Sequence, residues 1–473
     1  MPMYMSCFLP LRSIRQSSWR YPVTARLTRS ISMSCSREAQ ADWLRHVLED
    51  KNTEHPAPLY AWTAANLPDL KEKTAVSSAT TTAAAGSLTT DDEWRRRIHI
   101  LGVGNLGRLF ASSLPASPIT LVVHRRELLE RWHANPGIEI TRDGKVERSC
   151  VDVDVEWWTD EKPVSGPSRE PGAGRGISNL IVATKAKDAL PQADRLRAYL
   201  SPKSTVAFTQ NGMCPMWPPR GPEYSAHRWP AGDGPNWIAC ITTHGVISLA
   251  PFQSIHASQA FISVGPVLLN CQQPSGDSPA TYLIDQLADA PHLDGKSVSR
   301  GDLWVLQLEK LMINSVINPL TALLDCKNGE LFTAQAQNGV IGGVINSLIE
   351  EASRVFQALV LDKRISSEIM GEEYAADEKS MKSLLERFSF NRLHTMMLDV
   401  GFKVRDNTSS MLQDVRAGRT TEIRAFNGWL VETAALLDPN LRLSTHENLI
   451  VSVEAGTRLK LGTSETEHFL SQI

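Results

Sequence analysis

The sequence lacks any hydrophobic run that approaches the roughly 18 residues of a membrane-spanning helix. Cysteine is sparse, with seven residues in the whole sequence. These cysteines lie far apart and form no CxxC pair. This spacing supports neither a zinc site nor a disulfide framework, and it fits a reducing compartment. We therefore expect no membrane span and no metal site.

Acidic residues are missing altogether from the first 37 residues, which contain six arginines and eight serines. This composition is typical of a mitochondrial presequence and favours the mitochondrial matrix. An unstructured basic tail on a cytoplasmic protein is the alternative that stays open. Without this leader the net charge of −3 becomes −9. A mildly acidic body argues against general binding of nucleic acid.

The length of 473 residues predicts two folded domains with extensions. A Ser/Thr/Ala/Gly tract from Ser77 to Thr90 has the composition of a linker, so the folded part is expected to start near Arg96. The expected organisation has four parts: a presequence over 1–37, an extension with the linker over 38–95, a Rossmann-type domain over 96–295 and a helical substrate domain over 296–473.

A glycine-rich turn stands immediately after an apolar run that is typical of a buried parallel strand, Ile98–Leu101. Its three glycines have GxGxxG spacing, which allows a tight turn, close approach of a pyrophosphate and close packing of helix on strand. The helix that follows would direct its N-terminus at the phosphates. The predicted cofactor-binding residues of this turn are Gly102, Val103, Gly104, Asn105, Leu106 and Gly107.

The cofactor preference is predicted from the end of the second strand, Ile119–Val123. An acid about 20 residues after the glycines would bind the ribose hydroxyls of NAD, whereas an arginine accepts the 2′-phosphate of NADP. Arg125 and Arg126 come first at this position, and Glu127 fits the first turn of a helix better. The sequence therefore favours NADPH, with Arg125 as a binding residue.

Strands and helices alternate up to about residue 264, which predicts a parallel sheet of the nucleotide-binding type. Asp143-Gly144 is expected to turn a hairpin between Ile138–Thr141 and Val151–Val155. Met216–Asn236 is rich in Pro, Gly and Trp and is interpreted as an insertion. From about Asp302 the pattern is helical to the end of the sequence, and it contains no evident internal repeat.

A polar stripe interrupts the apolar helix predicted over Leu303–Leu320. Lys310, Asn314 and Asn318 recur every four residues, so they share one helix face of about 80°. Buried polar groups need partners, which either a salt-bridged core or a ligand cleft would supply. A second polar group lies around Ser409-Ser410, where one serine is a plausible N-cap.

Several motifs together resemble the ketopantoate reductase (2-dehydropantoate 2-reductase) family, in the order and spacing of that family, over roughly residues 97–460. The chain resembles a fungal-type member with an N-terminal extension. The motifs are GVGNLG at 102–107, TKA at 184–186, QNGM at 210–213, the stripe from Lys310 to Asn318 with PLT at 319–321, NGEL at 328–331, SSMLQD at 409–414 and TEI at 421–423.

The resemblance implies a Rossmann-type domain followed by an all-α domain like the C-terminal domain of 6-phosphogluconate dehydrogenase. It implies Lys310 as the general acid, and Glu422 as a second catalytic residue that also contacts the nicotinamide ribose. A protonated lysine suits this task, because it stabilises the developing alkoxide and supplies its proton. The implied substrate-binding residues are Asn314, Asn318 and Ser410, and Asn407 and Asn328 are second choices. The implied cofactor-binding residues are Lys185 and Asn211.

The activity implied is NADPH-dependent reduction of 2-dehydropantoate to (R)-pantoate, a step toward pantothenate and coenzyme A. Two alternatives stay open. One is a reductase of another short branched 2-keto acid, because Asn and Ser recognise a keto acid without specifying its tail. The other is a non-catalytic mitochondrial regulatory protein on the same fold. The partner is thus a small-molecule keto acid, and the resemblance leaves a homodimer open.

Overall fold

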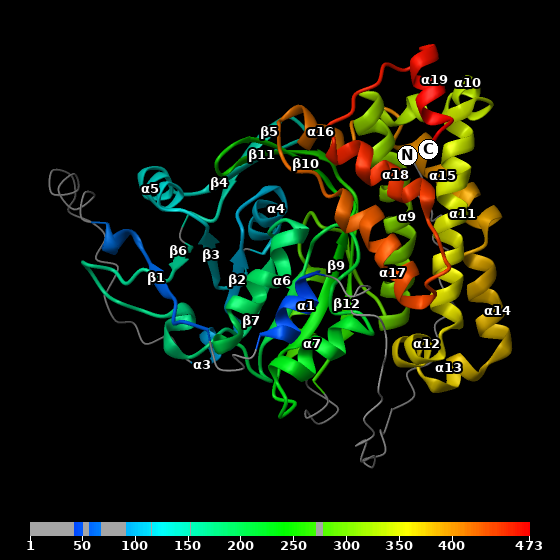
Figure 1. Cartoon of the computed structure of the whole chain (residues 1–473). Helices are drawn as coiled ribbons and strands as arrows, with labels where there is room; N and C mark the ends of the chain where they lie inside the picture. Colours follow the sequence, from blue (N-terminus) through cyan, green and yellow to red (C-terminus); the bar gives the residue numbers. More distant parts are fainter. Residues whose placement is uncertain (1–41, 51–55, 68–90, 115, 152, 271–277) are drawn as a thin grey trace. The chain divides into compact units, whose positions relative to one another are not determined.

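The computed structural model describes residues 42–50, 56–67, 91–114, 116–151, 153–270 and 278–473. The expected presequence over 1–37 and the tract from Ser77 to Thr90 lie outside these residues. Two compact units are present, of which one spans Val47–Leu303 and the other is built mainly from Trp304–Ile473. Figure 1 shows the strands in the first unit and a bundle of helices in the second.

The first unit contains a nine-stranded sheet in the order β1-β6-β3-β2-β7-β8-β9-β12-β13. Its six central strands are parallel, and their order is that of a Rossmann-type doubly wound sheet. The chain reverses its direction of winding between β2 and β7, where such sheets bind ligands. The strands are β1 (Tyr60–Trp62), β2 (Ile98–Leu101), β3 (Ile119–Val123), β6 (Asp154–Thr159), β7 (Asn179–Val182), β8 (Thr205–Phe208), β9 (Asn236–Thr242), β12 (Ile262–Leu268) and β13 (Gly295–Ser297).

Both faces of this sheet are buried, which is why its central strands are almost entirely apolar. On one face Ile98, Ile100 and Leu121 pack in a core with side chains of α4, α5 and α8. On the other face Phe208 stacks on Trp237, with ring centroids 5.7 Å apart. The helices of this unit are α3 (Asp91–Arg96), α4 (Asn105–Ser113), α5 (Arg126–Ala134), α6 (Ala186–Arg195), α7 (Arg220–Arg228) and α8 (Pro279–Ala288), and the boundary between the two units falls within α1 (Asp42–Glu49), after His46.

A second sheet of four strands packs against α4. Asp143 and Gly144 both have positive φ and form the expected two-residue turn. The expected partner strand was wrong, however. The turn joins β4 to β5, whereas Asp154 and Val155 begin β6 of the large sheet. The strands are β4 (Ile138–Arg142), β5 (Lys145–Ser149), β10 (Gly245–Ala250) and β11 (Gln253–Ser258).

One segment before the expected folded region and the predicted insertion within that region are both part of this unit. The expectation that folding starts near Arg96 was wrong, because β1 pairs antiparallel with β6 and Trp62 packs on Trp157 with ring centroids 5.5 Å apart. The predicted insertion is also built into the unit. Arg228 on α7 donates two hydrogen bonds to Asp194 on α6, at 2.8 and 2.9 Å.

The second unit is helical, as the sequence predicts. Asp362, Asp377, Ser409 and Thr463 each accept a backbone N–H in the first turn of a helix, which explains where four of the helices begin. The helices are α9 (Arg300–Leu324), η5 (Asn328–Phe332), α10 (Ala334–Gln337), α11 (Val340–Leu361), α12 (Lys363–Met370), α13 (Glu372–Ala376), α14 (Glu378–Arg387), α15 (Phe390–Lys403), α16 (Ser410–Arg416), η6 (Arg424–Gly428), α17 (Trp429–Leu437), α18 (Ser444–Glu454) and α19 (Ser464–Leu470). In the described part of the chain no helix is long and apolar enough to cross a membrane.

Three buried histidines predict a loss of stability in mild acid. Burial lowers the pKa of His99, His256 and His446 to about 4, because it disfavours the charged imidazolium. The unfolded chain binds these protons near pH 6.5, so stability falls as the pH decreases from 6.5 to 4. Carboxylates with a lowered pKa, such as Asp362 and Glu454, matter only below about pH 4.5. We expect the thermal midpoint to drop between pH 7 and 5, and an unchanged midpoint would contradict this.

Candidate active site

The glycine turn has the geometry that its spacing predicts. Gly102 has φ of +97°, and a Cβ there would lie 3.0 Å from the Ala183 carbonyl oxygen. A Cβ on Gly107 would lie 1.9 Å from the Gly102 carbonyl oxygen, so only glycine lets α4 start this close to β2. Gly104 is different, because nothing lies within 4 Å of its Cβ position. The space above Gly104 therefore fits a pyrophosphate that approaches the backbone.

The ends of the neighbouring strands converge on this turn. Gln210, after β8, donates hydrogen bonds to the carbonyl oxygens of Val182 (2.6 Å) and Thr184 (3.2 Å) at the end of β7. Lys185 is exposed at the N-terminus of α6, and Asn211 is half-buried three residues after the end of β8. Both predicted cofactor residues thus lie at the carboxyl ends of parallel strands, where doubly wound sheets bind ligands.

Asn105 and Arg108 show a contact that the sequence analysis missed. The side chain of Asn105 donates to the Val246 carbonyl oxygen (2.8 Å) and accepts from Arg108 (2.8 Å). Because these bonds hold the side chain against β10, the backbone of Asn105 is the part that remains for a cofactor. The buried guanidinium of Arg108 also donates to Ala250 (2.6 Å) and Ser248 (2.9 Å). Burial lowers the pKa of Arg108 to about 10. In the sequence, an arginine directly before the apolar residues 109 and 110 could have indicated a buried guanidinium that needs partners.

The structure separates the two arginines at the end of β3. Arg126 pairs with Glu130 one helical turn later, with N and O atoms 2.7 Å apart. Arg125 is more than half exposed, and its nearest carboxylate oxygen, on Glu127, lies 4.0 Å away. Arg125 is therefore the better placed of the two to meet a 2′-phosphate.

This difference gives a prediction on cofactor preference. We expect Arg125→Ala to raise the dissociation constant of NADPH roughly 10- to 100-fold, because a charge-assisted hydrogen bond is worth about 1.5–3 kcal/mol. The constant for NADH, which lacks the 2′-phosphate, should change less than twofold. Fluorescence titration of both cofactors measures this. Arg126→Ala is the matched control, and equal losses of NADPH binding in the two variants would refute the assignment.

In the helical unit, α9 carries the predicted polar stripe. Asn318 is buried, whereas Lys310 and Asn314 are half-buried on the same helix face. Asn318 Nδ2 lies 3.5 Å from Ser410 Oγ, so two of the predicted substrate-binding residues meet. Ser409 is the N-cap of α16 and accepts the Leu412 N–H at 3.1 Å. Ser410 is therefore not needed for the cap.

Other predicted residues lie in the same unit, and some of them are linked to this pair. The Thr321 and Ser409 hydroxyl oxygens are 2.7 Å apart, which joins α9 to the start of α16. Asn407 is exposed, and its carbonyl oxygen accepts the Asn328 N–H at 3.1 Å. Glu422 is half-buried just before η6. The structure thus joins Asn318, Ser410 and the 407–409 segment in one network.

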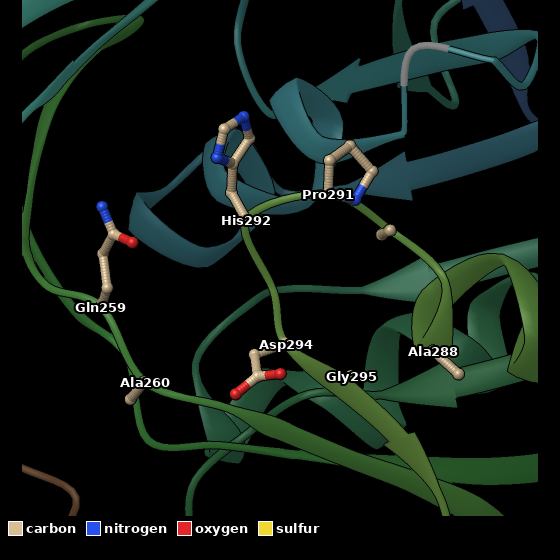
Figure 2. Close-up of a pocket in the computed structure, with 8 residues that line it drawn as sticks. Gln259, Ala260, Ala288, Pro291, His292, Asp294 and Gly295 are labelled. Carbon is tan, nitrogen blue, oxygen red and sulfur yellow. The ribbon is translucent and has the colours of Figure 1, made fainter. Parts of the chain in front are cut away.

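A shallow pocket lies at another place in the first unit. Figure 2 shows Gln259, His292 and Asp294 around it, at the loop between α8 and β13. None of the predicted site residues lines this pocket. Within the described ranges, no group of three His, Cys, Asp or Glu side chains could hold a metal ion. The candidate residues therefore form two groups, the glycine turn in the first unit and the α9 stripe in the helical unit.

Comparisons with known proteins follow the same division of the chain. The model described as Ketopantoate reductase PanE/ApbA matches residues 98–268, and the one described as Ketopantoate reductase PanE/ApbA C terminal matches residues 302–450. The chain belongs to the ketopantoate reductase family. This confirms the predicted Rossmann-type and helical domains and the expectation of a nicotinamide cofactor.

Relatives within the ketopantoate reductase family have two kinds of names. The chain is 41% identical to "Ketoisovalerate reductase BEA2" of Gibberella fujikuroi, over 87% of this chain and 95% of that protein. It is 29% identical to a "Probable 2-dehydropantoate 2-reductase" of Schizosaccharomyces pombe, over 71% and 90%. A putative ketopantoate reductase from Ralstonia solanacearum has the same fold, with a TM-score of 0.53, 16% identity and coverage of 76% and 97%.

Proposed function

We propose that this ketopantoate reductase family member reduces a short branched 2-keto acid with NADPH, and that 2-ketoisovalerate is preferred over 2-dehydropantoate. The observation that carries the substrate choice is the 41% identity, over 95% of its length, to a protein named ketoisovalerate reductase. The likeness to a protein named 2-dehydropantoate 2-reductase is lower, at 29%. The two acids share the 2-keto carboxylate and differ by one hydroxymethyl group.

The proposed chemistry assigns one task to each group of residues. The cofactor supplies a hydride to C2 of the keto acid when it is bound. Lys310 donates its Nζ proton to the C2 oxygen, which becomes the hydroxyl, and the lysine then regains a proton from water. The amides of Asn314 and Asn318 and the hydroxyl of Ser410 are polar groups of the kind that hold a carboxylate. Glu422 is assigned the task of orienting Lys310, the role that the family resemblance implies for it.

The assay that tests the proposal is oxidation of NADPH by the purified full chain, followed at 340 nm, with each acid in turn. We expect kcat/KM for 2-ketoisovalerate to exceed that for 2-dehydropantoate by 10-fold or more, because a pocket discriminates one such group by about 1–3 kcal/mol. A preference for 2-dehydropantoate would replace the substrate but keep the reaction class. No turnover with either acid or with other branched 2-keto acids would favour the non-catalytic alternative.

We also propose that the chain enters mitochondria, on the basis of the acid-free, arginine-rich first 37 residues. A fluorescent protein fused behind residues 1–37 should co-localise with a mitochondrial marker. The matched control replaces the six arginines of this segment with glutamine. Cytoplasmic fluorescence of the unaltered fusion would support the alternative location.

A further inference from the structure

Helix α9 contains a proline within the stripe of predicted site residues. Pro319 has no N–H, so the carbonyl oxygen of Ser315, four residues earlier, loses its ordinary helical partner. Ser315 is fully buried, where water does not replace the missing donor. A buried carbonyl left without a donor costs about 1–3 kcal/mol. The lost bond would have joined residues 315 and 319, which directly follow Asn314 and Asn318. Both asparagines are predicted to bind substrate.

Asn427 supplies the missing donor from a distant part of the chain. Its Nδ2 lies 2.9 Å from the Ser315 carbonyl oxygen and 2.9 Å from Nδ1 of His446. A carbonyl oxygen only accepts hydrogen bonds, so the amide nitrogen must face it, and the amide orientation is fixed. Asn427 and His446 are both fully buried.

His446 is fixed in turn by α11. Because its Nδ1 accepts from Asn427, its Nε2 carries the proton and donates to the Leu348 carbonyl oxygen at 3.2 Å. The buried Glu351, one turn further along α11, accepts the backbone N–H groups of Thr445 (3.0 Å) and His446 (3.2 Å). These hydrogen bonds connect Asn427 on η6 to His446 on α18, and α18 to α11, so the orientation of the Asn427 amide is fixed by neighbouring helices.

Asn427 lies in η6, which is a single π-helical turn. Such turns insert one extra residue into a helix and occur frequently at functional sites. This turn starts two residues after Glu422, and Arg424 anchors it to Glu454 on α18 through two hydrogen bonds of 2.7 and 2.6 Å. The Asn427 amide reaches the Ser315 carbonyl oxygen of α9 from this turn. This one hydrogen bond joins the segment after Glu422 to the part of α9 that carries the polar stripe.

We propose that Asn427 is a positioning residue for the reduction, which fixes the segment that carries Glu422 against the part of α9 that carries Asn314 and Asn318. It does so by replacing the hydrogen bond that Pro319 removes. The inference rests on the proposed function, because it assigns these side chains to the keto acid site. It predicts that the proline and the asparagine act as a pair.

A double-mutant cycle tests the pairing. We expect Asn427→Ala to lower kcat with 2-ketoisovalerate roughly 100-fold, because a displacement of about 1 Å at a site has that effect. The dissociation constant of NADPH, which binds the glycine turn, should change less than twofold. In the double variant Pro319→Ala/Asn427→Ala, residue 319 regains an N–H for the Ser315 carbonyl. This variant should regain part of the thermal midpoint lost in Asn427→Ala, but kcat should stay within about threefold of that single variant, because the bond to the segment that carries Glu422 is still missing.

A matched control separates positioning from general stability. Ser353 is also buried and donates to the Phe388 carbonyl oxygen at 2.7 Å, far along the chain from the polar stripe. Ser353→Ala should lower the thermal midpoint but leave kcat within twofold. If Asn427→Ala does not fold, Asn427→Ser, which keeps a small polar group, takes its place in the cycle. Equal kcat in the Asn427 variant and the wild type, or full recovery of kcat in the double variant, would overturn the proposal.

Hydrogen–deuterium exchange distinguishes a failure of this inference from a failure of the proposed function. Asn427→Ala should speed exchange of the backbone amides at 316–322 and 423–428, and the double variant should slow exchange at 316–322 again. If the wild type reduces no 2-keto acid, the proposed function fails but this readout still tests the bond. Unchanged exchange in Asn427→Ala would show that the bond does not hold α9.

Discussion

Lys310→Ala should lower kcat for 2-keto acid reduction by roughly 10²- to 10⁴-fold, the contribution of a general acid. Its half-buried position on α9, one turn before Asn314, places the lysine on the same helix face as the proposed carboxylate-binding amides. The dissociation constant of NADPH should stay within about threefold of the wild type. Steady-state kinetics and cofactor titration together give this split.

Two further variants show whether the lysine acts as an acid or only as a charge. Lys310→Arg keeps the positive charge, but the pKa of a guanidinium is far higher than that of an ammonium group, which makes it a poor proton donor, so kcat should recover only in part. Lys382→Ala, at an exposed position of α14, is the control for loss of a surface lysine. Turnover of Lys310→Ala at the wild-type rate would remove Lys310 from the mechanism.

The glycine turn gives the second large effect, because its glycines are required for different reasons. In Gly104→Ala the new methyl group meets no protein atom within 4 Å, so the thermal midpoint should not change. The methyl group would instead occupy the space of the pyrophosphate, and NADPH should bind roughly 100-fold more weakly, which is about 2.7 kcal/mol. Calorimetric titration and thermal unfolding measure the two properties separately.

Gly107→Ala should have the opposite profile. Its Cβ would lie 1.9 Å from the Gly102 carbonyl oxygen, so α4 must move away from β2. Overpacking of this kind costs about 1–3 kcal/mol or more, and the thermal midpoint should fall by several degrees. If Gly104→Ala destabilised the fold while Gly107→Ala did not, the assigned roles of the two glycines would be wrong.

Local sequence signals were sufficient for the dinucleotide turn and for the switch to helices near residue 302. The backbone itself requires glycine at Gly102 and Gly107, and the spacing of Gly104 is that of a position where a pyrophosphate approaches the chain, so the motif specifies the turn locally. The Ser409 cap is local in the same sense. These features need no information about tertiary contacts.

Pairing over longer distances could not be predicted in the same way. Residues 145–149 and 151–155 both follow the Asp143-Gly144 turn in the sequence, and it is pairing with the distant strand β3 that includes Asp154 and Val155 in the large sheet. A strand as short as β1 has too few residues for a periodic signal. The donor for the Ser315 carbonyl lies 112 residues away, although Pro319 within a helix indicates that such a donor is needed.

The edge strand β1 has a consequence for proteolytic maturation. It covers β6 at one edge of the large sheet, and Leu59 beside it accepts the Tyr199 hydroxyl and donates to it through its backbone. A protease that trimmed the chain beyond Trp62 would leave unpaired the N–H and C=O groups of β6 that bond to β1, while those that bond to β3 would keep their partners. Exposed strand edges promote edge-to-edge association between molecules. We therefore expect a form trimmed beyond Trp62 to aggregate at high concentration more readily than a form that retains residues 59–62.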